Sequence, residues 1–148
     1  MEETTKAYMA GIFDHSGFAL IKHTKPNLTV TIPINILYTD VLSVFEENYG
    51  IKYTSFKNIN SRHKIKSEVC CIFSDSNAAI FLTDIYPYLR SDRAKRIAEL
   101  ASEYYGLIKN NTQTIPAHNP KGGKQQVTLY NLNDKRIKEL KYELHDLV

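Results

Sequence analysis

The sequence predicts an α+β fold in which two β-hairpins form one saddle-shaped antiparallel sheet with helices packed behind it. The first observation is the regular alternation of apolar and polar side chains over residues 28–36, which is the period of a half-buried strand. The second is the order of the elements, αββαββα with a further helix near the C-terminal end. A chain of 148 residues with 43% hydrophobic content is long enough to bury a core as one domain.

The N-terminal part is expected to contain a helix, two strands and a second helix, at about residues 5–15, 18–24, 28–36 and 39–48. Thr4 or Thr5 is expected to cap the first helix, and Gly17 ends it. A Lys-Pro-Asn turn joins the two strands. The second helix begins at Thr39 or Asp40, and the glycine at its end closes it.

The remaining elements are expected to be a second hairpin and three helical segments, at about residues 51–58, 64–73, 74–85, 91–105 and 131–147. Pro87 separates the first two of these helices, and Ser91 or Asp92 caps the second. Residues 110–128 are polar and rich in Asn, Gln, Pro, Lys and Gly, which predicts either a mobile loop or one that orders on a partner. The last helix begins at Asn131 or Asn133 and is amphipathic.

Other features of the chain predict a cytoplasmic protein. No apolar run approaches about 18 residues, and the acidic N-terminus lacks the apolar region of a signal peptide. Cys70 and Cys71 are adjacent, a spacing that suits neither an ordinary disulfide nor a zinc site. Buried thiols in a reducing compartment are therefore expected, with nucleoid association in a bacterial or phage setting.

Basic residues are clustered although the formal net charge is only +3. One cluster lies within residues 52–66, a second within 90–96 and a third within 109–138. Clustered cations on a nearly balanced chain indicate one positive face and a polyanionic partner. Solvated loops and helix faces would explain any single cluster equally well.

Two segments carry a resemblance to a known family. Residues 8–17 read Tyr-Met-Ala-Gly-Ile-Phe-Asp-His-Ser-Gly, which resembles the signature helix of the LAGLIDADG homing endonucleases. Residues 80–89 resemble that family's helix-Pro-aromatic-Leu segment, which precedes a basic helix. The order of elements also matches over about residues 7–106. The resemblance implies a DNA-binding domain over residues 1–108, with residues 109–148 as a basic loop and a helix packed on the same domain.

The single motif implies a homodimer, because single-motif members of this family pair their motif helices at a two-fold axis. The small-residue stripe of this helix suits such a close contact, and the expected interface residues are Ala7, Ala10, Gly11 and Asp14. A tight contact within one subunit would use the same residues. The partner implied is double-stranded DNA with a near-palindromic site, which the paired sheets would straddle.

The motif departs from the family at the position that holds the catalytic metal. The family has an acidic residue there, and this chain has Ser16, which is neutral and a poor ligand for Mg²⁺. Asp14 lies two residues earlier, and two helical residues are about 200° apart around the helix axis, so the two side chains cannot point the same way. The resemblance therefore implies a binding protein without catalytic residues or a metal, and a transcriptional repressor is its most concrete role.

Three alternatives stay open at this point. One is an active Mg²⁺-dependent endonuclease that uses Asp14, the second is an RNA-binding intron maturase, and the third is an interaction module without a nucleic-acid partner. The polar faces of the hairpins supply the candidate base contacts, because Lys, Asn, Thr and Glu each suit particular base edges. Further Lys and Arg residues would hold phosphates. The expected DNA-binding residues are Lys22, Thr24, Thr29, Thr31, Asn35, Tyr53, Ser55, Lys57, Arg62, Lys64, Lys66, Glu68, Arg93, Lys121 and Lys124.

Overall fold

A computed structural model describes residues 1–22, 27–35, 40–51, 54–58, 66–110, 113–118, 124–129 and 135–148. Its main sheet is antiparallel and has the strand order β1-β2-β4-β3. The bounds of these strands are Phe18–Ile21 for β1, Leu28–Asn35 for β2, Thr54–Asn58 for β3 and Lys66–Ser74 for β4. The two hairpins expected from the sequence therefore form one four-stranded sheet, which confirms the predicted α+β fold.

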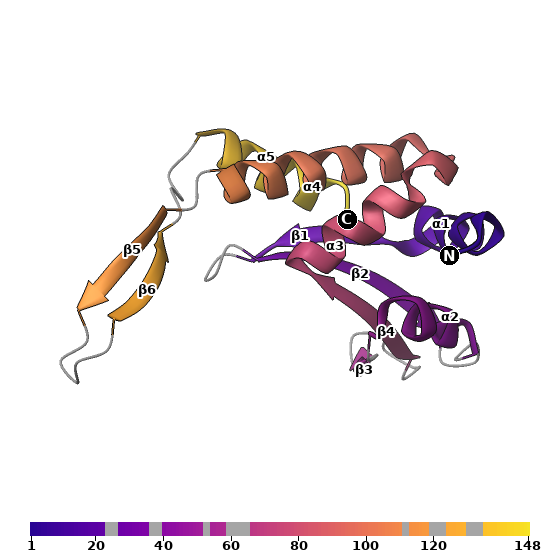
Figure 1. The fold of residues 1–148 in the computed structure, drawn as a ribbon. Helices are drawn as coiled ribbons and strands as arrows, with labels where there is room; N and C mark the ends of the chain where they lie inside the picture. Colours follow the sequence, from indigo (N-terminus) through magenta and orange to yellow (C-terminus); the bar gives the residue numbers. More distant parts are fainter. Residues whose placement is uncertain are drawn as a thin grey trace.

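Helices cover one face of this sheet (Figure 1). Their bounds are Glu3–Ser16 for α1, Asp40–Tyr49 for α2, Asp75–Ile85 for α3, Asp92–Asn110 for α4 and Lys135–Asp146 for α5, with a short 3-10 helix η2 at Tyr86–Tyr88. A separate hairpin of β5 (Gln113–His118) and β6 (Lys124–Leu129) projects away from the main body (Figure 1). Among the described residues, none of the helices is long and apolar enough to cross a membrane.

The core lies between the sheet and the helices. On β2, Leu28, Val30, Ile32 and Ile34 are buried, as the alternating pattern predicts. Aromatic rings complete the core: those of Phe73 on β4 and Phe81 on α3 stack with centroids 4.2 Å apart. The C-terminal helix belongs to the same cluster through Ile137, Leu140 and Leu144, so α5 buries its apolar stripe against the rest of the chain.

Two helix ends agree with the sequence, at Gly50 and at Ser91. Gly50 has a φ of +65° just after α2, the left-handed conformation that glycine adopts at helix ends. The Ser91 hydroxyl accepts a hydrogen bond from the Ala94 N–H at 3.0 Å, which caps α4 as expected. Helix α1, however, begins at Glu3 after an N-cap at Glu2 that makes no side-chain cap bond. The expected cap at Thr4 or Thr5 was wrong.

The polar segment at residues 110–128 also differs from expectation. The structure places the β5–β6 hairpin there, with Ile115 opposite Val127 and Pro116 opposite Gln126. Its sequence lacks the regular apolar alternation that identifies a strand, so composition alone favoured a loop. Asn131 and Asn133, the expected starts of the last helix, lie outside the described residues, and α5 begins at Lys135.

Candidate nucleic-acid interface and the end of the first helix

One row of residues on β2 faces away from the helices. This row contains Thr29, Thr31, Pro33 and Asn35, which alternate with the buried residues of the same strand. Asn35 is exposed and Thr31 is half-buried. Thr29 is only 8% exposed, and its hydroxyl donates to the Leu20 carbonyl at 3.3 Å. On the outward face, Thr31 and Asn35 are therefore more exposed than Thr29.

The neighbouring strands extend this outward face. The register pairs Asn35 with Glu68 and Thr31 with Ile72, and directly opposed residues of an antiparallel pair belong to the same face. Lys22 follows the end of β1 and is exposed. Ile72 was not among the expected contact residues, although it is 37% exposed. Ile72 could have been identified from the sequence, because it shares the alternation of residues 68 and 70.

The sequence leaves the parity of the third strand ambiguous, and the register shows which residues of β4 oppose it. The register pairs Ser55 with Val69 and Lys57 with Ser67, whereas Phe56 pairs with Glu68. Ser55 is therefore opposite Val69, which is buried. Residues 53–58 mix polar and aromatic types in both rows, so the sequence pattern could not determine which row faces outward.

The other expected contact residues are distributed as follows. Lys66 is at the start of β4, opposite Asn58 and in the row of Glu68. Lys124 begins β6, opposite His118. Outside the described residues lie Thr24, Tyr53, Arg62, Lys64 and Lys121.

Arg93, an expected phosphate contact, is hydrogen-bonded within the subunit. Its Nε donates to the Leu147 carbonyl at 2.8 Å, and its Nη1 donates to the Gly17 carbonyl at 3.1 Å. The side chain thereby joins α4 to the end of α1 and to the C-terminal segment. Sequence reasoning missed this role because both partners are backbone carbonyls, which no residue pattern marks.

Several other cations of the basic clusters are paired with acids. On α4, Arg96 contacts Glu143 of α5 at 2.8 Å. Arg136 of α5 contacts Glu103 at 2.6 Å, which lowers the pKa of the Glu103 carboxyl through that hydrogen bond. The clusters on α4 and α5 are thus partly neutralised between the two helices. Arg96 and Arg136 are therefore each paired with an acid within the subunit.

Ser16 is the last residue of α1, and its hydroxyl is directed at backbone carbonyls. The Oγ atom lies 3.2 Å from the Pro33 carbonyl oxygen on β2 and 3.4 Å from the Ile12 carbonyl oxygen. A hydroxyl can donate to these acceptors, whereas a carboxylate could not. Gly17 follows at once, and a Cβ atom there would lie 2.0 Å from the ring of Phe13. Glycine is therefore required where the chain turns from α1 into β1.

Asp14 is engaged within the subunit. Its Oδ2 accepts a hydrogen bond from the Arg90 N–H at 2.9 Å. Its Oδ1 accepts from the Ser91 N–H at 3.1 Å and from the Ser91 hydroxyl at 3.0 Å. These donors lie just before α4, where the positive end of the helix dipole favours a carboxylate. Asp14 therefore ties the end of α1 to the start of α4.

These contacts leave a poor site for a divalent cation. A carboxylate offers about four lone-pair positions, and three of those on Asp14 accept the bonds just described. Ser16 contributes a neutral hydroxyl that donates to carbonyls. A divalent cation prefers carboxylate ligands, so within one subunit this end of α1 offers it only the remaining lone-pair position of Asp14.

Small residues and one tyrosine are exposed in the middle of α1. Ala7 and Gly11 are exposed, no atom lies within 4 Å of a Cβ added at Gly11, and Tyr8 is 49% exposed. Ala10 is fully buried and Asp14 is occupied as described. Of the four expected interface residues, Ala7 and Gly11 are the ones that face outward within a single subunit.

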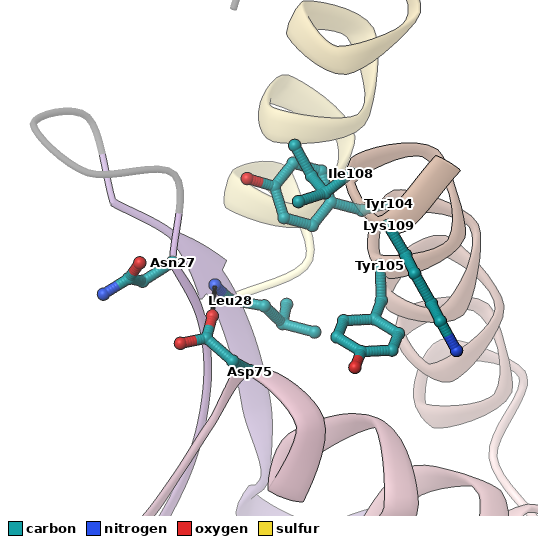
Figure 2. A pocket seen from close by; sticks show the side chains of 7 residues that line it. All are labelled: Asn27, Leu28, Asp75, Tyr104, Tyr105, Ile108 and Lys109. Carbon is teal, nitrogen blue, oxygen red and sulfur yellow. Dashed lines mark hydrogen bonds between the residues drawn. The ribbon is translucent and has the colours of Figure 1, made fainter. Parts of the chain in front are cut away.

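A cavity of about 260 Å³ lies elsewhere, between the start of β2, the start of α3 and the end of α4 (Figure 2). Asp75 at its edge has a φ of +48°, and its Oδ1 accepts a hydrogen bond from the Leu28 N–H at 3.2 Å. The lining residues are Asn27, Leu28, Asp75, Tyr104, Tyr105, Ile108 and Lys109. None of them was expected to contact a ligand.

Comparison with known proteins yields a structural match only. No protein-family model matches the chain, and no curated protein matches it. A solved structure does: a homing endonuclease, I-CvuI, in complex with the I-CreI target in the presence of 2 mM Mg, with the DNA not cleaved. The match has a TM-score of 0.58 at 15% identity and covers 99% of this chain and 83% of the other. The architecture is therefore that of the LAGLIDADG homing endonucleases.

Proposed function

We propose that this chain binds duplex DNA sequence-specifically, as a homodimer on a near-palindromic site, without cleaving it. A dimer that binds a promoter without cutting would occlude it, so the role proposed is that of a transcriptional repressor. The observation that carries the proposal is the chemistry at the end of α1, where Ser16 donates to carbonyls and Asp14 is held by α4.

The surroundings of Ser16 support the absence of cleavage. In this geometry an aspartate at position 16 would place a carboxylate beside the Pro33 and Ile12 carbonyl oxygens, which are 3.2 and 3.4 Å from the present hydroxyl. Oxygen acceptors gathered in this way repel one another unless a cation lies between them. The serine removes both that repulsion and the carboxylate a cation would need.

The outward sheet face supports DNA binding. Lys22 and Asn35 are exposed on it, and Thr31 is half-buried. These residue types match the donor and acceptor groups that bases present in the major groove. The solved structure of similar fold was determined in complex with the I-CreI DNA target, so a protein of this architecture can bind DNA.

The test combines selection of bound duplexes with a cleavage assay. The purified protein is expected to select one near-palindromic sequence from a random duplex pool and to leave it intact in Mg²⁺ or Mn²⁺. Raising the salt concentration should weaken binding steeply, because phosphate contacts release counterions. Structured RNA should compete poorly. Cutting of the selected site by the parent protein would overturn the proposal.

A gain-of-function variant sharpens this test. Ser16→Asp restores a carboxylate at the end of α1 and is expected to introduce metal-dependent cleavage of the selected site. Ser43→Asp is the matched control, because Ser43 is exposed on α2 and the change adds the same charge. The control is expected to leave binding and the absence of cleavage unchanged.

A further inference from the structure

An apolar band crosses the outward face of the sheet. The register aligns Phe18 of β1 with Thr31 of β2, and Thr31 with Ile72 of β4. Phe18 and Thr31 are half-buried, and Ile72 is 37% exposed. The next row toward Asn35 pairs Pro33 with Cys70. An isoleucine in a central strand, on the face away from the core, has no role in packing that core.

The band lies within the face proposed to contact DNA. Lys22 is exposed at one end of that face, and Asn35 is exposed at the other. Base edges in the major groove present mainly hydrogen-bonding groups, and their one prominent apolar feature is the C5-methyl group of thymine. Among the groups on base edges, a half-exposed isoleucine between polar residues therefore suits only the methyl group of thymine.

We infer that Ile72, together with the methyl group of Thr31, reads thymine methyl groups in each half-site. The inference rests on the proposed function, because it assigns base specificity to the sheet face that would contact the duplex. Burying a methyl group against Ile72 would favour thymine over uracil by roughly fourfold in affinity at each contact.

Replacing thymine by uracil tests this inference directly, since uracil keeps the base pair and removes only the methyl group. Uracil is placed at each thymine of the selected duplex in turn, and the dissociation constant is measured. The affinity of the parent protein is expected to fall by about fourfold when uracil replaces one or more thymines in each half-site. The Ile72→Ala variant is expected to lose most of this discrimination between thymine and uracil at those positions, with Thr31 supplying the remainder.

Two further variants keep the test informative. Ile80→Ala is the matched control, because Ile80 is 54% exposed on α3 and away from the sheet face; it should retain the parent's sensitivity to uracil. If Ile72→Ala melts early, Ile72→Val removes a single methylene group and should reduce the sensitivity without unfolding the strand.

The outcomes separate this inference from the proposed function. Two results would overturn the role of Ile72 and leave the DNA-binding proposal intact. One is specific binding by the parent with no loss of affinity at any uracil position. The other is a loss of affinity that persists unchanged in both Ile72 variants. A parent protein that selects no duplex sequence at all would overturn the proposed function and this inference with it.

Discussion

Replacing Gly11 by alanine is expected to have opposite effects on the fold and on the proposed dimer. Gly11 lies inside α1, and no atom is within 4 Å of an added Cβ. Alanine is favoured over glycine in a helix interior by about 0.8–1.0 kcal/mol. The single subunit should therefore become more stable by up to about 1 kcal/mol, which is roughly fivefold in the folding equilibrium.

The dimer should respond in the other direction. If the motif helices cross at Gly11, the two-fold axis brings both copies of the residue to one contact. The distance between packed helices is set by the side chains at that contact, and extra methyl groups in a tight contact cost about 1–3 kcal/mol. The dimer dissociation constant should therefore rise by at least roughly fivefold.

Urea denaturation at low protein concentration and sedimentation velocity across a concentration series measure the two effects separately. Gly106→Ala is the matched control, because Gly106 lies inside α4 and its added Cβ also has nothing within 4 Å. It should stabilise the subunit without changing the dimer constant. A Gly11→Ala protein that is more stable and dimerises as well as the parent would refute the close helix contact. A less stable subunit would refute the open surroundings of Gly11.

Three further predictions concern residues inside the subunit. Asp14→Asn should lower the unfolding free energy by about 2 kcal/mol, because hydrogen bonds to a charged group are worth more than neutral ones; a melting curve identical to the parent's would contradict the Asp14 contacts with α4. Gly17→Ala should destabilise by about 1–3 kcal/mol through overlap with the Phe13 ring, and Phe13→Leu in the same chain should recover part of that loss in urea titrations. Burial raises the pKa of the Cys71 thiol to about 12, so alkylation of Cys71 at pH 8, followed by mass spectrometry, should be slow until denaturant is added.

Local patterns predicted the parts of the fold that short-range physics determines. The alternation along β2 identified its core face correctly, since each residue alternates sides regardless of distant contacts. Gly50 and Ser91 ended and began helices as their chemistry requires. The parity of β3 could not be predicted, because Ser55 and Phe56 occupy rows that only pairing with β4 distinguishes.

The candidate site was less accessible to sequence reasoning. The significance of Ser16 follows from its place in the motif, but its contact with the Pro33 carbonyl depends on how α1 packs on the sheet. The bonds from Arg90 and Ser91 to Asp14 join residues 76 and 77 positions apart. Arg93 resembled a surface cation in the sequence, yet it binds backbone carbonyls at Gly17 and Leu147. Such long-range contacts leave no periodic signal in the chain.

The bond between Asp14 and the start of α4 has an evolutionary consequence. An acidic residue that anchors a helix is under selection for folding, whether or not the protein cuts DNA. A lineage that lost cleavage would therefore keep Asp14, together with the buried Met9, Ala10 and Phe13 around it. Retention of these residues therefore reports on stability rather than on activity. Under the proposed function, position 16 is the one that should differ between chains of this fold that cut DNA and chains that do not.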